Sequence, residues 1–198
     1  MSIYPPSRVR ALLPGELDWP NVRAPRSKRV SEAVAVATRI LEDEGAAALT
    51  MRRLAGEMGI KAASLYKHFA SKSELELLLI EDALFDVGEI THRSIQHPGD
   101  NTMVVSLLTT YRAHSLSNPN LYRLATSGPL DRHRLPDGLE EWAGNPWFVV
   151  TGDEFLAQAL WSFAHGMVVL ELDKRFPPDS NLDATWRAGA TAFERSVA

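Results

Sequence analysis

The 198-residue chain contains no cysteine. This absence excludes thiol catalysis, CxxC redox chemistry, iron–sulfur clusters and zinc sites of the finger type, all of which need thiolates. Disulfides are excluded as well, so a hydrophobic core must hold the fold. Apolar residues make up 45% of the chain, which is enough for a sizeable core at this length. The sequence therefore predicts a globular protein of one or two domains.

A long uninterrupted apolar run is also missing. The longest apolar stretch, 155–170, has 16 residues and includes Gln158, Ser162 and His165. A bilayer-spanning helix needs about 20 predominantly apolar residues. The first 26 residues hold five prolines and four arginines but no apolar centre of a secretory signal. We therefore expect no membrane partner and a cytoplasmic location.

Strand-type alternation of apolar and polar residues is absent over any useful length, whereas apolar residues recur at helical spacing. The predicted fold class is all-α. Thr50 stands where an N-cap belongs, and either Ser71 or Ser73 can cap the long helix that follows. In the Pro- and Gly-rich segment 128–152 only one short helix, around 135–143, is expected. The other expected helices span about 28–44, 51–58, 62–69, 74–96, 102–117, 119–127, 153–175 and 183–197.

Charge is distributed unevenly along the chain. Between Arg23 and Lys72, ten Lys/Arg stand against five Asp/Glu, a net charge of +5, while the whole chain carries −4. The remainder therefore sums to −9. Such asymmetry is typical of a basic module that meets a polyanion, and the alternative is a chance fluctuation of surface charge.

The two short helices at 51–58 and 62–69, joined through a Gly-containing turn, form a helix-turn-helix. Their core motif Leu65-Tyr66-x-His68-Phe69-x-x-Lys72 resembles the DNA-binding signature of TetR-type transcriptional repressors, over roughly residues 28–80. Trp161-x-x-x-His165-Gly166 resembles a Trp-His-Gly subgroup of the same family. The prolines of residues 1–26 predict a Pro-rich arm, which is longer than the usual lead of the family. The resemblance implies a helix-turn-helix DNA-binding domain (27–73) and a ligand-binding and dimerisation domain (74–198).

A recognition helix in the major groove needs small or polar side chains on its outer face, which Ala62 and Ser64 provide. Lys61 and Lys67 can donate to guanine, or they can simply lie on a solvated surface. The resemblance assigns Tyr66 and His68 to phosphate contacts, the alternative being a role in capping the domain core. The expected DNA-binding residues are Thr50, Arg52, Lys61, Ala62, Ser64, Tyr66, Lys67, His68 and Lys72. Arg53 either joins them or is solvated. The arm's arginines enter the minor groove, are disordered or dock on the body.

His165 lies in a nearly all-apolar helix, where an unpaired imidazole would cost free energy. It is either a satisfied core or interface histidine or a polar group of an effector pocket. The expected pocket residues are Tyr111, Trp147, Phe163, His165 and Met167, each of which could instead belong to the core. Histidines 92, 97, 114 and 133 lack metal-site spacing and are expected at the surface or as caps. No metal or cofactor is expected.

The sequence predicts a transcriptional regulator that binds a palindromic DNA operator as a homodimer. We expect a repressor that a small-molecule effector releases, without enzymatic activity. The helices at 153–175 and 183–197 of each protomer are expected to form a four-helix interface, the last one through Trp186, Ala190, Phe193 and Val197. The alternatives are a helical ligand-binding or scaffold protein that never touches DNA, and an enzyme of unrecognised type.

Overall fold

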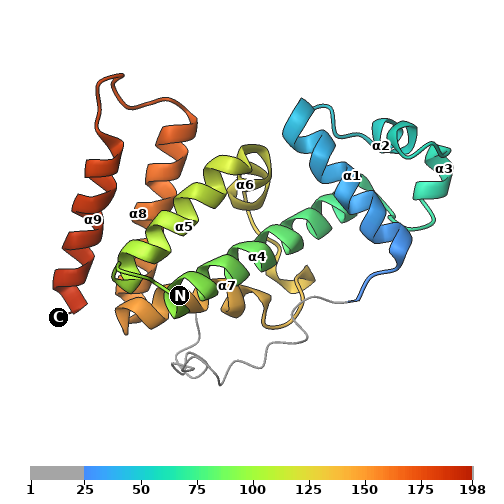
Figure 1. The fold of residues 1–198 in the computed structure, drawn as a ribbon. Helices are drawn as coiled ribbons and strands as arrows, with labels where there is room; N and C mark the ends of the chain where they lie inside the picture. The colour runs from blue at the N-terminus through green and yellow to red at the C-terminus, as the bar shows by residue number, and fades with distance from the viewer. Residues whose placement is uncertain (1–24, 198) are drawn as a thin grey trace. The chain divides into compact units, whose positions relative to one another are not determined.

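The structure is a computed structural model that describes residues 25–197. Over this range it contains helices and no strand, which confirms the predicted all-α class. Figure 1 shows the order of the helices along the chain. They are α1 (Lys28–Glu44), α2 (Met51–Glu57), α3 (Ala62–Leu65), α4 (Lys72–Gln96), α5 (Met103–Ser117), α6 (Pro119–Thr126), the short 3₁₀ turn η1 (Arg132–Arg134), α7 (Leu139–Thr151), α8 (Glu154–Leu172) and α9 (Leu182–Val197).

The described residues fall into two compact units. The helix-turn-helix unit comprises residues 25–87 and 114–140, and the α8–α9 unit comprises residues 88–113 and 141–197. Helices α4, α5 and α7 each contribute residues to both units, because the unit boundaries fall inside them, after Val87, Ala113 and Glu140.

Local signals set the ends of the helices in the helix-turn-helix unit. Thr50 caps α2, its hydroxyl accepting a hydrogen bond from the N–H of Arg53 at 3.1 Å, as predicted. Ser71, not Ser73, caps α4, since its hydroxyl accepts from the N–H of Glu74 at 3.2 Å. Gly45 follows α1 with φ +83°, a backbone conformation that favours glycine. Short-range chemistry therefore accounts for the turns that bring α1, α2 and α3 together.

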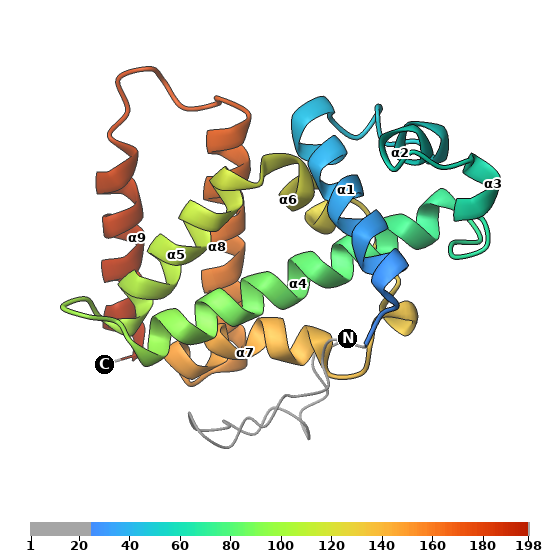
Figure 2. The same cartoon turned by 45° about the vertical axis from the view of Figure 1, so that its right-hand side comes forward.

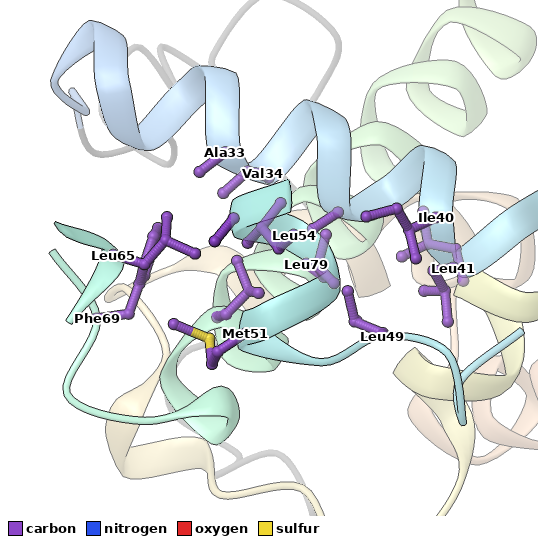
Figure 3. Packing of buried hydrophobic residues seen from close by; sticks show 14 of the residues in the cluster. Ala33, Val34, Ile40, Leu41, Leu49, Met51, Leu54, Leu65, Phe69 and Leu79 are labelled. Atoms are coloured by element: carbon purple, nitrogen blue, oxygen red, sulfur yellow. The ribbon is translucent and has the colours of Figure 1, made fainter. Parts of the chain in front are cut away.

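The core of this unit is closed and apolar. Leu54 and Leu65 have no exposed surface, and Phe69 is 1% exposed. Figure 3 shows these side chains converging with residues of α1 and with Leu79 of α4. Burying each such side chain contributes about 1.5–3 kcal/mol of transfer free energy. This core fixes α2 and α3 as a rigid platform.

In the α8–α9 unit, α8 and α9 lie side by side (Figures 1 and 2). Arg112 of α5 ties both helices together, because its guanidinium pairs with Glu171 of α8 at 2.9 Å and with Asp183 of α9 at 2.6 Å. The indole N–H of Trp186 donates to the same Glu171 carboxylate. The three helices are thereby fastened at one end of α8.

Helix α7 corrects the expectation of a short helix around 135–143, because it runs over Leu139–Thr151 and continues through Pro146. Proline has no N–H, so the carbonyl of Trp142, four residues earlier, loses its helical donor. His92 of α4 fills the vacancy: its Nε2 donates to that carbonyl at 3.0 Å, and its ring stacks on Trp142. His92 is buried, so the surface position expected for it is wrong, whereas its hydrogen bond to the carbonyl of Trp142 agrees with the other alternative, a capping role.

Helix α8 (Glu154–Leu172) is shorter than the expected helix at 153–175 but longer than the 16-residue apolar stretch 155–170. Its 19 residues make it long and apolar enough to cross a membrane by length and composition only, so the expectation that the apolar segment is too short does not hold for the helix. The core helix of a soluble protein meets the same criteria. Ala157, Leu160 and Ala164 of α8 are buried within the α8–α9 unit.

Candidate nucleic-acid interface

The outer face of α2 and α3 carries most of the predicted DNA-binding residues. Each short helix turns its large apolar side chains, such as Leu54 and Leu65, into the core, which leaves the opposite side to solvent. Six of the nine predicted residues are exposed and three are partly buried. The exposed ones are Thr50, Arg52, Lys61, Tyr66, Lys67 and His68, and the partly buried ones are Ala62, Ser64 and Lys72.

Tyr66 is a large side chain of this face that stays exposed, with 55% of its surface accessible to solvent. It follows α3 directly, at the C-cap position. Its neighbour His68 is exposed as well, with only an edge contact to the ring of Phe69 at 6.4 Å between centroids. Neither side chain fills the core, so both polar tips are accessible.

The cations near this face divide into paired and unpaired ones. Arg53 is bound by Glu44 at 2.6 Å and by Glu57 at 2.7 Å, and it holds the pKa of Glu57 below its usual range. Arg53 therefore joins α2 to the end of α1 rather than standing free. Within residues 25–197, Arg52, Lys61 and Lys67 make no ion pair, so their charges face solvent.

Lys72 has partners within the protein. Its ammonium lies 3.2 Å from a carboxylate oxygen of Glu76 and 3.5 Å from the carbonyl oxygen of Ala46. The lysine thus steadies the loop between α1 and α2. A phosphate contact by Lys72 would have to share the ammonium with these acceptors.

Arg26, at the end of the expected arm, is committed to α4. Its guanidinium pairs with Glu81 at 2.9 Å and with Asp82 at 2.8 Å, and 12% of its side chain is exposed. The arm's other arginines, Arg8, Arg10 and Arg23, lie outside the described residues. At Arg26, docking on the body is therefore the observed arrangement.

The five predicted effector-pocket residues lie in three places within the α8–α9 unit. Tyr111 and Trp147 meet edge to face, with centroids 5.0 Å apart. Phe163 packs on Trp186 of α9, and Met167 is buried one turn further along α8. His165 instead stacks on Trp161, on the exposed side of α8. Burial lowers the pKa of His165.

Two polar features of the α8–α9 unit were not predicted from the sequence. One is the pair of His92 and Trp142, for which Pro146 was the available signal. The other is Asn145, whose Oδ1 is buried without a hydrogen-bond partner in the described part of the chain. A separate groove of about 270 Å³ lies between α5 and α9. It is lined by Val105, Leu108, Thr109, Arg112, Asp183, Trp186, Arg187 and Ala190, none of which is a predicted pocket residue.

Within the described range, no three His, Asp or Glu side chains are placed so that they could hold a metal ion. The outer face of α2 and α3 carries exposed cations and the exposed ring of Tyr66. Such a surface on two short helices is typical of helix-turn-helix modules that bind nucleic acid.

Comparison with known proteins finds a family model that is similar to this module. Residues 33–77 match the model of the bacterial regulatory proteins of the tetR family. The match spans α1, α2, α3 and the start of α4. Residues 33–77 are therefore similar to the N-terminal helix-turn-helix domain of that family. Its Trp161-x-x-x-His165-Gly166 sequence has no such match, and the subgroup that it resembles stays a prediction.

Relatives of known sequence and structure agree with the module and the fold. An HTH-type transcriptional regulator of Mycobacterium tuberculosis is 26% identical over 121 residues, covering 58% of this chain and 50% of that protein. The chain thus spans about half the length of the curated relatives it matches. A solved structure from Rhodococcus sp. RHA1 superposes with a TM-score of 0.71 at 18% identity, covering 87% of this chain and 97% of that one. The multidrug-binding protein EbrR superposes with a TM-score of 0.59 at 21% identity, covering 87% and 97%.

Proposed function

We propose that this protein is a TetR-type transcriptional regulator that binds a palindromic operator as a homodimer. One observation carries the proposal: the exposed face of α2 and α3 gathers Arg52, Lys61 and Lys67 without ion pairs within residues 25–197, around an exposed Tyr66. Unpaired cations release counterions from DNA, and an aromatic ring with a polar tip suits the phosphate backbone.

The nine predicted residues have two kinds of role in this proposal. Lys61, Ala62, Ser64 and Lys67 read base edges, because they lie on or next to the short helix α3. Thr50, Arg52, Tyr66, His68 and Lys72 contact phosphates and set the register. The DNA-binding part is then built on residues 27–73, with 74–198 serving ligand binding and dimerisation.

Dimerisation is proposed for α8, which leaves large apolar side chains exposed on more than one side of the helix. Phe155 is 70% exposed, Trp161 43% and Leu170 40%, an unusual surface for a protein without an apolar partner. A two-fold contact through α8 and α9, with Trp161 in it, covers part of this surface in the most common way. It also brings two recognition helices onto one duplex, where half-sites lie about 34–36 Å apart or a multiple of that.

Regulation by a small-molecule effector completes the proposal. Tyr111, Trp147, Phe163, His165 and Met167 are the candidate contacts, and the multidrug-binding EbrR has the same fold. The effector releases the operator if it binds the dimer more tightly in a conformation that cannot reach both half-sites. Such a regulator acts in the cytoplasm as a repressor and uses no cofactor.

Selection from a random-sequence duplex library tests the proposal. We expect enrichment of a palindrome whose affinity falls steeply with salt. Tyr66→Ala should weaken all duplexes about equally, whereas Lys67→Ala should also change the preferred base at one position in each half-site. Arg175→Ala, which removes an exposed cation from the α8–α9 unit, is the matched control. No enrichment and no salt-sensitive binding would favour a helical scaffold that never touches DNA.

A further inference from the structure

Helix α6 (Pro119–Thr126) does not cap itself. Asn118 is a residue type that usually caps a helix, but its backbone has φ −130° and ψ +61° and its side chain makes no cap hydrogen bond. Instead, its Nδ2 donates backwards to the carbonyl of His114 at 3.1 Å. The first N–H groups of α6 therefore need an acceptor from elsewhere.

Glu42 of α1 supplies that acceptor. Its carboxylate accepts hydrogen bonds from the backbone N–H of Leu121 at 2.6 Å and of Asn120 at 3.3 Å. The Nδ2 of Asn120 returns a hydrogen bond to the backbone carbonyl of Glu42 at 3.1 Å. The positive end of the α6 dipole also favours a carboxylate at this place. A side chain almost eighty residues earlier in the sequence thus does the work of the N-cap.

Apolar packing adds to the hydrogen bonds between Glu42 and α6. Leu121 is 7% exposed and belongs to the same apolar cluster as Leu54 and Leu65, and Leu124 and Ala125 pack against that cluster. An isolated helix of 8 residues is marginal in water. Helix α6 is therefore held in its helical form by its docking on α1.

The same end of α1 is fastened to α2. Glu44, two residues after Glu42, pairs with Arg53 of α2 at 2.6 Å. One turn of α1 thus binds α6 through one carboxylate and α2 through another. The packing of α1 against α2 therefore depends on the ion pair of Glu44 with Arg53 and on the hydrogen bonds of Glu42 to α6.

We propose that Glu42 is a positioning residue for DNA binding, which docks α6 on α1 and so fixes the scaffold that orients α2 and α3. This inference rests on the proposed function, because it concerns how well the exposed face of α2 and α3 fits an operator. Glu42 itself touches no nucleic acid in this proposal. Its effect reaches DNA through the geometry of α1.

Charge and geometry predict opposite effects when Glu42 is neutralised. Removing a negative charge from a DNA-binding unit strengthens its general attraction to phosphates. Loss of the carboxylate weakens the cap and loosens the exposed face of α2 and α3. A weakening equal to one ordinary hydrogen bond corresponds to about fivefold weaker operator binding. Glu42→Gln should therefore bind the selected duplex about fivefold more weakly than wild type, on the scale of one hydrogen bond, yet bind an unselected duplex at least as tightly.

Asp43→Asn is the matched control, because Asp43 is the next residue of α1 and is exposed. It removes the same charge without touching α6, so it should bind both duplexes at least as tightly as wild type. Equal ratios of selected to unselected affinity in the two variants would overturn the inference. If wild-type protein enriches no duplex, the proposed function fails, and this inference falls with it.

Hydrogen exchange supplies a readout independent of DNA. In Glu42→Gln, the amides of Asn120 and Leu121 should exchange faster than in Asp43→Asn, because their acceptor is weakened. Unchanged exchange at both amides would contradict the cap. If Glu42→Gln does not fold, Asn120→Ala replaces it, since it removes only the hydrogen bond to the Glu42 carbonyl. That variant should lose about twofold in selectivity, less than a full hydrogen bond, and wild-type selectivity would overturn the inference.

Discussion

The two units of this protein bury and expose opposite kinds of surface. The helix-turn-helix unit closes its apolar core completely around Leu54 and Leu65, and the outer face of its helices α2 and α3 shows cations to solvent. The α8–α9 unit buries polar groups such as His92 and Thr151, yet leaves Trp161 of α8 exposed. A unit that is apolar inside and charged outside is complete as a monomer and meets its partner through electrostatics. A unit with an exposed apolar helix face needs another protein surface to cover it.

The largest expected effect tests the closed core. Leu65→Ala should lower the free energy of unfolding by about 3 kcal/mol, because Leu65 has no exposed surface and the cavity cannot collapse in a well-packed core. Urea unfolding followed by circular dichroism measures the loss. Ala63→Ser, at an exposed position of the same helix, should stay within about 0.5 kcal/mol of wild type. A cost below about 1 kcal/mol for Leu65→Ala would mean that this core is loosely packed.

The exposed face of α8 gives the next effect. Trp161→Glu should raise the dissociation constant of the dimer at least about thirtyfold, since buried tryptophans often contribute 2 kcal/mol or more to an interface. Sedimentation equilibrium measures the change. The fold of each protomer should be retained, because Trp161 is 43% exposed. Gln158→Ala, on the same helix, is the control for a nearby truncation. A wild-type protein that is already monomeric at micromolar concentration would rule out this interface.

Substituting alanine for a glycine is expected to change the stability of the protein in opposite directions at Gly88 and at Gly56. A Cβ at Gly88 of α4 would lie 2.3 Å from the indole nitrogen of Trp142, whereas a Cβ at Gly56 of α2 would meet nothing within 4 Å. Gly88→Ala should therefore destabilise the protein by about 1–2 kcal/mol through overpacking. Gly56→Ala should stabilise it by about 0.5–1 kcal/mol, because alanine loses less entropy in a helix. Thermal unfolding of both variants decides, and a stabilising Gly88→Ala would show that Trp142 moves aside freely.

The helix boundaries could be predicted where the responsible chemistry is local. The Thr50 cap and the glycine after α1 act within a few residues, so the sequence shows them directly. Helix α7 could not be predicted, because Pro146 indicates a break and the compensating donor, His92, stands fifty residues earlier. The capping of α6 by Glu42 of α1 could not be predicted for the same reason, because the two lie far apart in the sequence. Local patterns predict helices, and only the folded chain shows which distant side chain satisfies an exposed carbonyl or N–H.

The candidate sites divide in the same way. On α2 and α3, the helical spacing of the buried leucines shows which side of each helix faces the core. The opposite side faces solvent, so the exposure of Lys67 and Tyr66 could be predicted. The partners of Arg53 and Lys72 required the folded chain. That the five expected pocket residues do not all lie together could be predicted in part. Residues two positions apart, such as 163 and 165, point to different sides of a helix.

The smallest expected effect concerns the polar interior of the α8–α9 unit. Burial lowers the pKa of His92 despite the hydrogen bond to the Trp142 carbonyl, which opposes the shift. An unfolded histidine titrates near pH 6.5, so just below that value the unfolded chain binds more protons than the folded one. The free energy of unfolding should therefore fall as the pH is lowered from about 7.5 to about 5.5.

His92→Gln isolates this contribution. Its amide N–H can still donate to the Trp142 carbonyl that Pro146 leaves without a helical partner, but it cannot take up a proton. The variant should show a shallower fall in the urea midpoint over that pH range than wild type. Some fall should remain, because burial also lowers the pKa of His114 and of His165. His133→Gln, at an exposed position, is the control and should follow the wild-type curve. If His92→Gln follows it too, His92 is protonated as readily in the folded chain as in the unfolded one, and the polar interior of this unit is open to water.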